Sequence, residues 1–210
     1  MPAKYVSNKD ETIPLFKSPW LERLSHIHPA TPAIVFLPVV GWFLWQALRQ
    51  WPLLVLSGLA LAGLLLWTLT EYTLHRWVFH YLPKSTLGKH VHFLIHGIHH
   101  DYPKDSTRLV MPLPVSLPLA ALFGVAFWAV FGAYYRAAFA GFLAGYVMYD
   151  AIHYATHHWK MEGRIARFLT EYHLRHHFRD DDLGYGVSSP LWDYVFGTVA
   201  TPTRANRRTD

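Results

Sequence analysis

Residues 52–80 read PLLVLSGLALAGLLLWTLTEYTLHRWVFH, an apolar run long enough to cross a bilayer that leads directly into His75 and His80. The same arrangement recurs along the chain, because ten of its fifteen histidines fall into four clusters and each cluster lies beside an apolar segment. The clusters are His75-x4-His80, His96-x2-His99-His100, His153-x3-His157 and His173-x2-His176-His177. Neutral imidazole is a common ligand of iron, zinc, copper and nickel, so the repetition predicts a metal centre beside a membrane.

The composition predicts an integral membrane protein. Of the 210 residues, 52% are hydrophobic and 16% are charged, which is too apolar for a small soluble domain. Four apolar stretches approach the length of a membrane span: residues 33–48, 52–74, 117–131 and 134–152. We expect an all-α fold with four transmembrane helices in two hairpins and a cytosolic helical cap that holds the histidines. The chain has no cysteine, which excludes disulfides, iron–sulfur clusters and a thiol nucleophile.

The distribution of basic residues predicts the orientation in the membrane. Only Arg49 and Arg136 lie at the two hairpin tips, and the other Lys and Arg share one side with all four histidine clusters. Because basic residues are retained on the cytoplasmic side, we expect the metal site to be cytosolic. The net charge of +5 then reflects this topology. No nucleic-acid-binding motif accompanies the charges, so we expect no nucleic-acid partner.

The segments outside the apolar stretches divide the chain further. We expect residues 1–30 to form an N-terminal cytosolic or interfacial segment, residues 31–202 the membrane domain, and residues 203–210 a disordered tail. Residues 11–28 are predicted either to lie in the membrane interface or to pack on the body of the protein. The proline-rich residues 111–118 predict an extended connection, and residues 159–178 a cytosolic helical stretch. Gly184 and Gly186 form an isolated G-x-G, which is no nucleotide fingerprint.

Helical spacing predicts how the histidines are shared between metals. Positions i, i+3 and i+4 lie on one helix face, so each H-x-x-H-H cluster is expected to point three imidazoles at one place, and His153 and His157 are neighbours. His75 and His80 diverge by about 140° on an α-helix, which favours two different metals for them. Ten imidazoles shared by two ions give five each. Five nitrogen donors leave one open octahedral position, which suits dioxygen activation by iron better than a four-coordinate zinc site.

Neutral ligands leave the metal charge uncompensated, so carboxylates are expected beside them. Glu71, Asp101 and Asp150 are the candidates to accept hydrogen bonds from the ligands' ring N–H groups, with helix-terminal charges or a turn residue as the alternative reading. Arg108 is expected to contact a phospholipid, with an anionic group of the substrate as the alternative. The sequence indicates no catalytic side chain beyond the metal site and does not identify the substrate-binding residues. We expect five histidines to lie outside the site: His26, His28, His90, His92 and His158.

The order of these clusters resembles the fatty acid hydroxylase superfamily of membrane di-metal oxygenases. Three stretches are most similar to its fatty acid and ceramide 2-hydroxylase branch: residues 71–76 (EYTLHR), 96–110 (HGIHHDYPKDSTRLV) and 149–154 (YDAIHY). Residues 184–196 (GYGVSSPLWDYVF) match the C-terminal signature of that branch. The resemblance covers about residues 60 to 200. It implies ten histidines binding two metals, and insertion of one oxygen atom from O2 at the carbon beside the carbonyl of a long acyl chain.

The resemblance also implies cofactors and partners. Iron is expected for activity, and zinc can occupy such sites in isolated preparations. We expect no fused cytochrome b5 domain such as eukaryotic members have, since His28-Pro29 is followed by Ala30-Thr31 rather than by the glycines of that haem module. Electrons are therefore expected from a separate cytochrome b5 or ferredoxin type protein. A bacterial inner membrane is the preferred location, with the endoplasmic reticulum as the alternative.

Two other functions fit parts of the pattern. A sterol or carotenoid hydroxylase or desaturase of the same superfamily would carry similar histidines. A membrane metal-binding or metal-transport protein would place ligands along a transmembrane path, but the clusters lie at the cytosolic ends and no charge lies mid-span. We therefore expect a fatty acid 2-hydroxylase acting on a long-chain acyl group, free or in a sphingolipid. Chain length, free acid against ceramide, stereochemistry and oligomeric state have no signal in the sequence.

Overall fold

The computed structural model describes residues 6–201, and every regular element among them is helical, so the expected all-α fold is confirmed. The predicted tail at 203–210 lies outside the described residues. The α-helices are α1 (Pro19–Ser25), α2 (Thr31–Leu48), α3 (Leu53–Leu74), α4 (Thr86–His92), α5 (Ile98–Asp101), α6 (Leu113–Phe131), α7 (Tyr135–His158), α8 (Arg164–Phe178) and α9 (Leu191–Phe196). Two π-helices, η1 (His75–Phe79) and η2 (Phe93–Gly97), and a 3-10 turn, η3 (Gly132–Tyr134), complete them.

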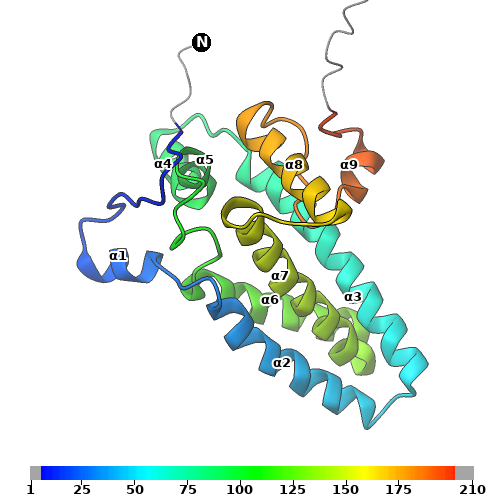
Figure 1. Cartoon of the computed structure of the whole chain (residues 1–210). Coiled ribbons are helices and arrows are strands. Elements are labelled where there is room, and N and C mark those ends of the chain that lie inside the picture. Colours follow the sequence, from blue (N-terminus) through cyan, green and yellow to red (C-terminus); the bar gives the residue numbers. More distant parts are fainter. Residues whose placement is uncertain (1–5, 202–210) are drawn as a thin grey trace, which may run out of the picture.

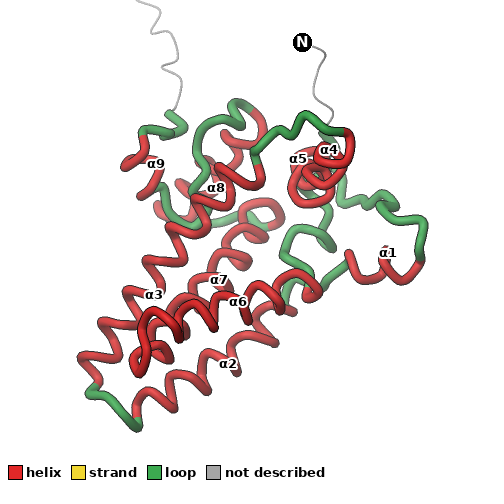
Figure 2. The backbone as a smooth tube through the Cα atoms, turned by 180° about the vertical axis from the view of Figure 1, so that it is seen from behind, coloured by secondary structure: helices red, strands yellow, loops and turns green. Residues whose placement is uncertain are grey.

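Three apolar helical stretches in the described part of the chain are long enough to cross a membrane: Thr31–Leu48, Leu53–Phe79 and Leu113–His158. The third contains α6, η3 and α7, and Figures 1 and 2 show α6 and α7 packed side by side. Gly132 allows the chain to turn between them, because its φ of 53° lies in the region that favours glycine. The protein is an integral membrane protein by these helices, and four crossings remain a prediction.

Helix α7 lies at the centre of the bundle, in contact with α2, α3 and α6 (Figure 1). Small residues allow α3 and α7 to approach closely. A Cβ added at Gly63 of α3 would lie 1.8 Å from the carbonyl oxygen of Ala138, and one added at Gly141 of α7 would lie 1.9 Å from that of Ala60. Such small-residue contacts are typical of helix packing within lipid, where van der Waals contact replaces the hydrophobic effect.

Helix α6 begins at Leu113, so the prediction of an extended connection at residues 111–118 is wrong for most of that range. Pro114 lies in the first turn, where a backbone N–H has no intrahelical partner and its absence costs nothing. Pro118 lies inside the helix and removes one backbone hydrogen bond. Leu113 packs against the hydrophobic core, and this contact helps to offset the loss.

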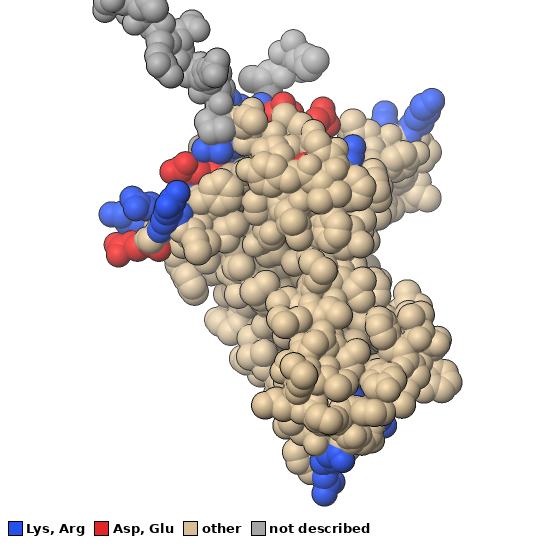
Figure 3. Space-filling view, turned by 90° about the vertical axis from the view of Figure 1, so that its right-hand side faces the viewer, with Lys and Arg blue, Asp and Glu red and all other residues tan. Residues whose placement is uncertain are grey.

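A cap of short helices covers one end of the bundle. Helices α4, α5, α8 and α9 lie together there, beyond the ends of α3 and α7 (Figure 2). On the side of the molecule seen in Figure 3, the visible Lys, Arg, Asp and Glu side chains gather at the two ends. The surface between the two ends is uncharged. Exposed apolar side chains such as Leu54 and Val130 cover the bundle, as expected of a surface that faces lipid.

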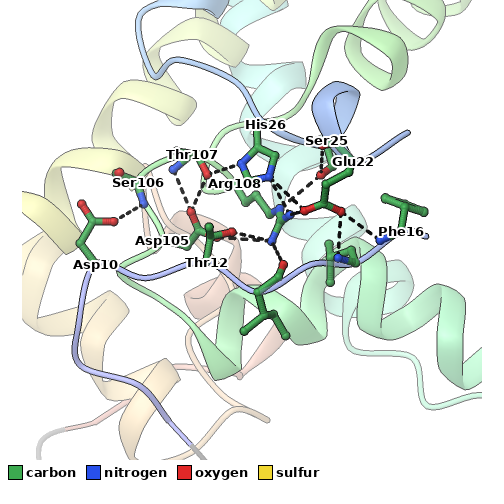
Figure 4. A network of polar contacts seen from close by, with 12 residues as sticks. Asp10, Thr12, Phe16, Glu22, Ser25, His26, Asp105, Ser106, Thr107 and Arg108 are labelled. Atoms are coloured by element: carbon green, nitrogen blue, oxygen red, sulfur yellow. Dashed lines mark hydrogen bonds and ion pairs between the residues drawn. The ribbon is translucent and has the colours of Figure 1, made fainter. Parts of the chain in front are cut away.

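Arg108, in the connection between α5 and α6, binds the N-terminal segment to the rest of the protein (Figure 4). The Arg108 side chain is 5% exposed; its guanidinium pairs with Glu22 and donates to the Thr12 hydroxyl at 2.7 Å and to the Ile13 carbonyl. These contacts within the protein occupy the side chain, so the prediction of a phospholipid contact is wrong. The expectation that residues 11–28 pack on the protein is supported by these contacts. Trp20 of α1 is 74% exposed, and a position in the membrane interface stays a prediction.

Candidate metal centre

The structure gathers the ten clustered histidines into two groups of five, which is consistent with a di-metal site. Within each group one ring nitrogen per residue lies within 4.8 Å of the others. Group A consists of His75, His80, His96, His100 and His176, and group B of His99, His153, His157, His173 and His177. All are buried except His80, which is partly buried. Among the described residues, neither group contains a carboxylate.

His75 and His80 both belong to group A, so the prediction that they serve two different metals is wrong. The cause is the π-helix η1, in which the N–H of His80 donates to the carbonyl oxygen of His75 at 3.1 Å. A π-helix closes its hydrogen bond over five residues rather than four. A five-residue spacing is then one turn, and the two rings lie on the same face with centroids 5.0 Å apart.

The H-x-x-H-H clusters divide between the groups, and the expectation that each points at one place is also wrong. His96 and His100 face group A, whereas His99 faces group B. The same division occurs on α8, where His176 belongs to group A and the other two histidines to group B. On an α-helix the i and i+4 positions are about 40° apart, while the i+3 position lies about 60° to the other side of i. Each of the two H-x-x-H-H segments therefore supplies histidines to both groups.

The nitrogen spacing in group A fits one ion. The Nε2 atom of His96 lies 3.2 Å from that of His75, 3.1 Å from that of His80 and 3.0 Å from that of His100. Metal–nitrogen bonds to histidine are about 2.1 Å long, so adjacent donors of an octahedral ion lie about 3.0 Å apart. The rings of His75 and His176 pack with centroids 4.6 Å apart, which brings the fifth residue to the same place.

Group B has the same spacing. The Nε2 atom of His99 lies 3.0 Å from that of His177 and 2.9 Å from that of His153. That of His173 lies 2.9 Å from His157 Nε2 and 3.1 Å from His177 Nε2. His153 and His157 are neighbours on α7, as expected from their spacing. The two groups adjoin each other, because the stacked rings of His100 and His177 have centroids 4.2 Å apart.

The surroundings keep the cap imidazoles neutral. Burial lowers the pKa of His96, His99, His173 and His177 well below its usual value, and the neighbouring histidines lower it further. The same causes lower the pKa of His100. A neutral imidazole has a free lone pair for a metal, whereas an imidazolium has none. Imidazoles held neutral in this way, within two groups of five, are chemically suited to binding two cations.

Backbone carbonyl groups orient two of the histidines in group A. His75 donates from Nδ1 to the carbonyl oxygen of Tyr185 at 2.6 Å, and His176 donates from Nδ1 to that of Leu183 at 2.9 Å. Since a carbonyl can only accept, these bonds place the proton on Nδ1 and direct the Nε2 lone pair to the group. These acceptors could not be predicted from the sequence, because every residue type has a backbone carbonyl.

The three predicted carboxylates have different surroundings. Glu71 accepts from the backbone N–H groups of Val187 and Ser188 at 2.6 and 2.8 Å, so it holds the loop beside Tyr185. Asp150 is 3% exposed on α7, one turn before His153. Asp101 ends α5 directly after His100. The partners of Glu71 are thus backbone N–H groups and the Ser188 hydroxyl. The direct contact with the ligand histidines that was predicted for the three carboxylates remains a prediction.

Asp193 is a functional candidate that the sequence reasoning missed. Its side chain, 0% exposed, accepts from the backbone N–H groups of Tyr185 and Gly186, both at 2.9 Å. Burial raises the pKa of this carboxyl, and the bonds from Gly186 and Thr198 oppose that change. The signal available in the sequence was a single acidic residue within the apolar run of residues 190–196.

The other five histidines lie outside both groups, in accordance with the prediction. His26 Nδ1 lies 2.7 Å from the Thr107 hydroxyl in the N-terminal network, and His158 stacks on Tyr154 with ring centroids 4.3 Å apart. His28 precedes α2, whereas His90 and His92 lie on α4. Short spacing to a cluster therefore does not bring a histidine into the site.

Comparison with known proteins agrees with this site. The family model described as fatty acid hydroxylase matches residues 60–198. A dihydroceramide fatty acyl 2-hydroxylase of Arabidopsis thaliana is 40% identical over 177 residues, which cover 83% of this chain and 74% of the relative. A ceramide very long chain fatty acid hydroxylase of Saccharomyces cerevisiae is 42% identical, covering 90% of this chain and 50% of that protein. The fatty acid 2-hydroxylase of Homo sapiens is 33% identical, covering 94% and 59%.

A solved structure is similar as well. The structure of scs7p, in which only the hydroxylase domain is visible, superposes with a TM-score of 0.83 at 41% sequence identity. The similarity covers 88% of this chain and 71% of that chain. The yeast and human relatives are longer than this chain, which aligns with their hydroxylase regions. The matched family model, the identities and the two histidine groups together show that the chain belongs to the fatty acid hydroxylase family of enzymes.

Proposed function

We propose that this protein hydroxylates carbon 2 of a long-chain fatty acyl group, free or within a sphingolipid, with two iron ions held by groups A and B. The relatives that act on dihydroceramide or ceramide acyl chains support this substrate class. The proposed catalytic domain covers residues 31–202. One oxygen atom of O2 would enter the C–H bond as a hydroxyl group, and the other would leave as water with two protons and two electrons.

One observation carries the proposal: each group offers five imidazoles with one ring nitrogen each within 4.8 Å of the others, and neighbouring Nε2 atoms in each group lie about 3 Å apart. Five neutral nitrogen donors would leave one position of an octahedral ion open. The bound iron would supply the activation of O2. The chain itself contributes the rigid donor set and a buried, cap-covered site that limits access of bulk water.

The apolar bundle beneath the cap supports a lipid substrate. An acyl chain can remain in the hydrocarbon and present only its carbonyl end at the level of the histidines. We propose that α2, α3, α6 and α7 each cross the bilayer and that the cap is cytosolic, in a bacterial inner membrane rather than the endoplasmic reticulum. A separate cytochrome b5 or ferredoxin type protein would deliver the electrons.

The experiment is lipid profiling of a bacterial strain that expresses the protein. The wild type should add one oxygen atom to acyl chains, and fragmentation should place it at carbon 2. His99→Ala should abolish the product, whereas His90→Ala, which changes a histidine on α4 outside both groups, should not. Oxygen on sterol or carotenoid rings would refute the substrate assignment. Bound metal without any oxygenated lipid would favour a metal-binding or transport protein.

Topology is tested separately by cysteine labelling, since the native chain has no cysteine. Gln50→Cys and Ala133→Cys should react with an impermeant maleimide from outside intact cells, because both lie at hairpin tips. Lys160→Cys, between α7 and α8, should react only after the inner membrane is opened. Labelling of Lys160→Cys in intact cells would contradict a cytosolic cap.

A further inference from the structure

The loop at residues 183–188 contacts the two histidine groups unequally. Its carbonyl oxygens at Leu183 and Tyr185 accept hydrogen bonds from two histidines of group A, as described above. The Nδ1 atoms of three group B histidines have no hydrogen-bond partner in the described residues: His153, His173 and His177. The Nδ1 atom of His100 in group A has none either. The two hydrogen bonds that join the loop to histidine rings both go to group A.

Asp193 fixes the conformation of this loop from α9. Its Oδ1 atom accepts from the N–H of Tyr185 and its Oδ2 atom from the N–H of Gly186, both at 2.9 Å. Thr198 holds the preceding residue of the loop, because its carbonyl oxygen accepts from the N–H of Gly184 at 2.8 Å. Three successive residues of the loop are thus held by two residues that follow it in the chain.

A chain of side-chain hydrogen bonds connects Asp193 to α3. An ionised carboxylate only accepts, so the Thr198 hydroxyl donates to Asp193 at 2.8 Å. The Tyr72 hydroxyl then donates to Thr198 at 2.8 Å, and Arg76 donates to Tyr72 at 2.8 Å. Tyr72 lies three residues before His75. These bonds therefore connect the loop to α3, the helix that ends directly before His75.

Gly186 permits the close turn that this clamp needs. A Cβ at this position would lie 2.1 Å from the carbonyl oxygen of Ser189 and 2.9 Å from Oδ2 of Asp193. Any larger residue would push the loop from the carboxylate. The turn and the carboxylate fit each other closely, which indicates that the loop conformation is tightly specified.

We propose that Asp193 is a positioning residue for group A: it fixes the Tyr185 carbonyl that orients His75 and, through Thr198, supports the Leu183 carbonyl that orients His176, and so strengthens metal binding at this group alone. The inference rests on the proposed function, because it requires an ion at each group. Outer partners that orient a metal-bound histidine typically change metal affinity by about 10–100-fold when they are removed. Asp193 touches neither a histidine ring nor an ion, so its effect must pass through the loop.

The test measures metal content and metal release of the purified full-length protein. Wild type should bind two ions per chain. Asp193→Ala should lower the affinity of one ion by about 10–100-fold, visible as one ion lost at a chelator concentration that leaves two in the wild type. Trp192→Phe is the matched control on the same helix, because it removes only the bond to Thr68 at 3.0 Å and should retain both ions.

A second substitution identifies which ion is lost. Adding His75→Ala to Asp193→Ala should change metal content no further, whereas adding His153→Ala should bring it close to zero. Thr198→Val removes a donor to Asp193 with little change in shape, and should weaken the same ion more mildly. If Asp193→Ala fails to fold, the metal content of Thr198→Val tests the proposal instead.

The outcomes separate this inference from the proposed function. A wild type that binds fewer than two ions would contradict the di-metal proposal itself. Two ions in the wild type, together with a wild-type release profile in both Asp193→Ala and Thr198→Val, would overturn the role of Asp193. Equal weakening of both ions would also overturn it, since the loop contacts group A alone.

Discussion

The N–H of His80 donates to the carbonyl oxygen of His75 at 3.1 Å, and this bond makes five residues one turn of helix. On an α-helix the two rings would point about 140° apart. The π-helix places both in group A and so determines where one pair of donors converges. Single-turn π-helices are rare and occur often at functional sites, and η1 follows that rule.

Inserting an alanine after Val78 should turn the ring of His80 out of group A, because a six-residue spacing places two side chains about 120° apart on an α-helix. We expect metal content to fall from two ions to one and hydroxylation to fall at least about 100-fold. Inserting an alanine after Gln50 at the exposed hairpin tip is the control and should preserve both. An insertion after Val78 that keeps two ions would show that the spacing of this pair has no such role.

The contact of α3 with α7 should tolerate no side chain at Gly63. Alanine there would place its Cβ 1.8 Å from the carbonyl oxygen of Ala138 and force the helices apart. We expect the free energy of unfolding to fall by about 1–3 kcal/mol. Gly58→Ala on the same helix has no atom within 4 Å of the new Cβ and should be neutral or stabilising. Thermal unfolding in detergent compares the two, and an equal effect would contradict close packing.

Removing the carboxylate of Glu71 should release the loop from α3. Glu71→Ala would leave the buried N–H groups of Val187 and Ser188 without their acceptor, at about 1–3 kcal/mol for each. Glu71→Gln keeps one acceptor oxygen and should lose less stability and less activity. Melting temperature and hydroxylation rate of the two variants provide the measurement. Identical losses would show that charge, rather than the hydrogen bonds, is what the loop requires.

The attachment of α1 should depend on pH through Glu22. Burial alone would raise the pKa of this carboxyl, but the N–H groups of Phe16 and Leu15, together with His26 and Arg108, lower it to about 2 from 4.5. Its folded pKa lies below its unfolded value, so its contribution is complete above about pH 4.5 and is lost as the pH falls towards 2.

A probe on Leu21→Cys reports this detachment, because the native chain has no other thiol. Its anisotropy should fall between about pH 4.5 and 2 as α1 becomes mobile. The double variant with Glu22→Gln should show low anisotropy without a step in that range. A step of the same size in both proteins would place the titration elsewhere.

The sequence predicted the long helices well and the site geometry only in part. The predicted stretch 52–74 corresponds to α3 (Leu53–Leu74), and 33–48 to α2 (Thr31–Leu48), because long apolar runs have few alternatives within a bilayer. The histidine clusters were found from spacing alone. Their assignment to groups failed where it assumed an α-helical repeat, since no residue type in HRWVFH marks a π-helix.

Contacts between distant segments were also beyond the sequence. The bonds from His75 to the carbonyl of Tyr185, and from Arg108 to Glu22, join residues that are 110 and 86 positions apart. A carbonyl acceptor carries no side-chain signature, and an arginine near a membrane suggests lipid before it suggests a buried partner. Asp193 stands out in the sequence as a single acidic residue in an apolar segment. Only the fold shows that it accepts hydrogen bonds from the loop at residues 183–188.

The division of the H-x-x-H-H clusters has a consequence for the pair of ions. Since α5 and α8 each give histidines to both groups, turning either helix would displace donors of both groups at once. The two donor sets are therefore coupled through the backbone, and a substitution that reorients one of these helices should disturb the binding of both ions.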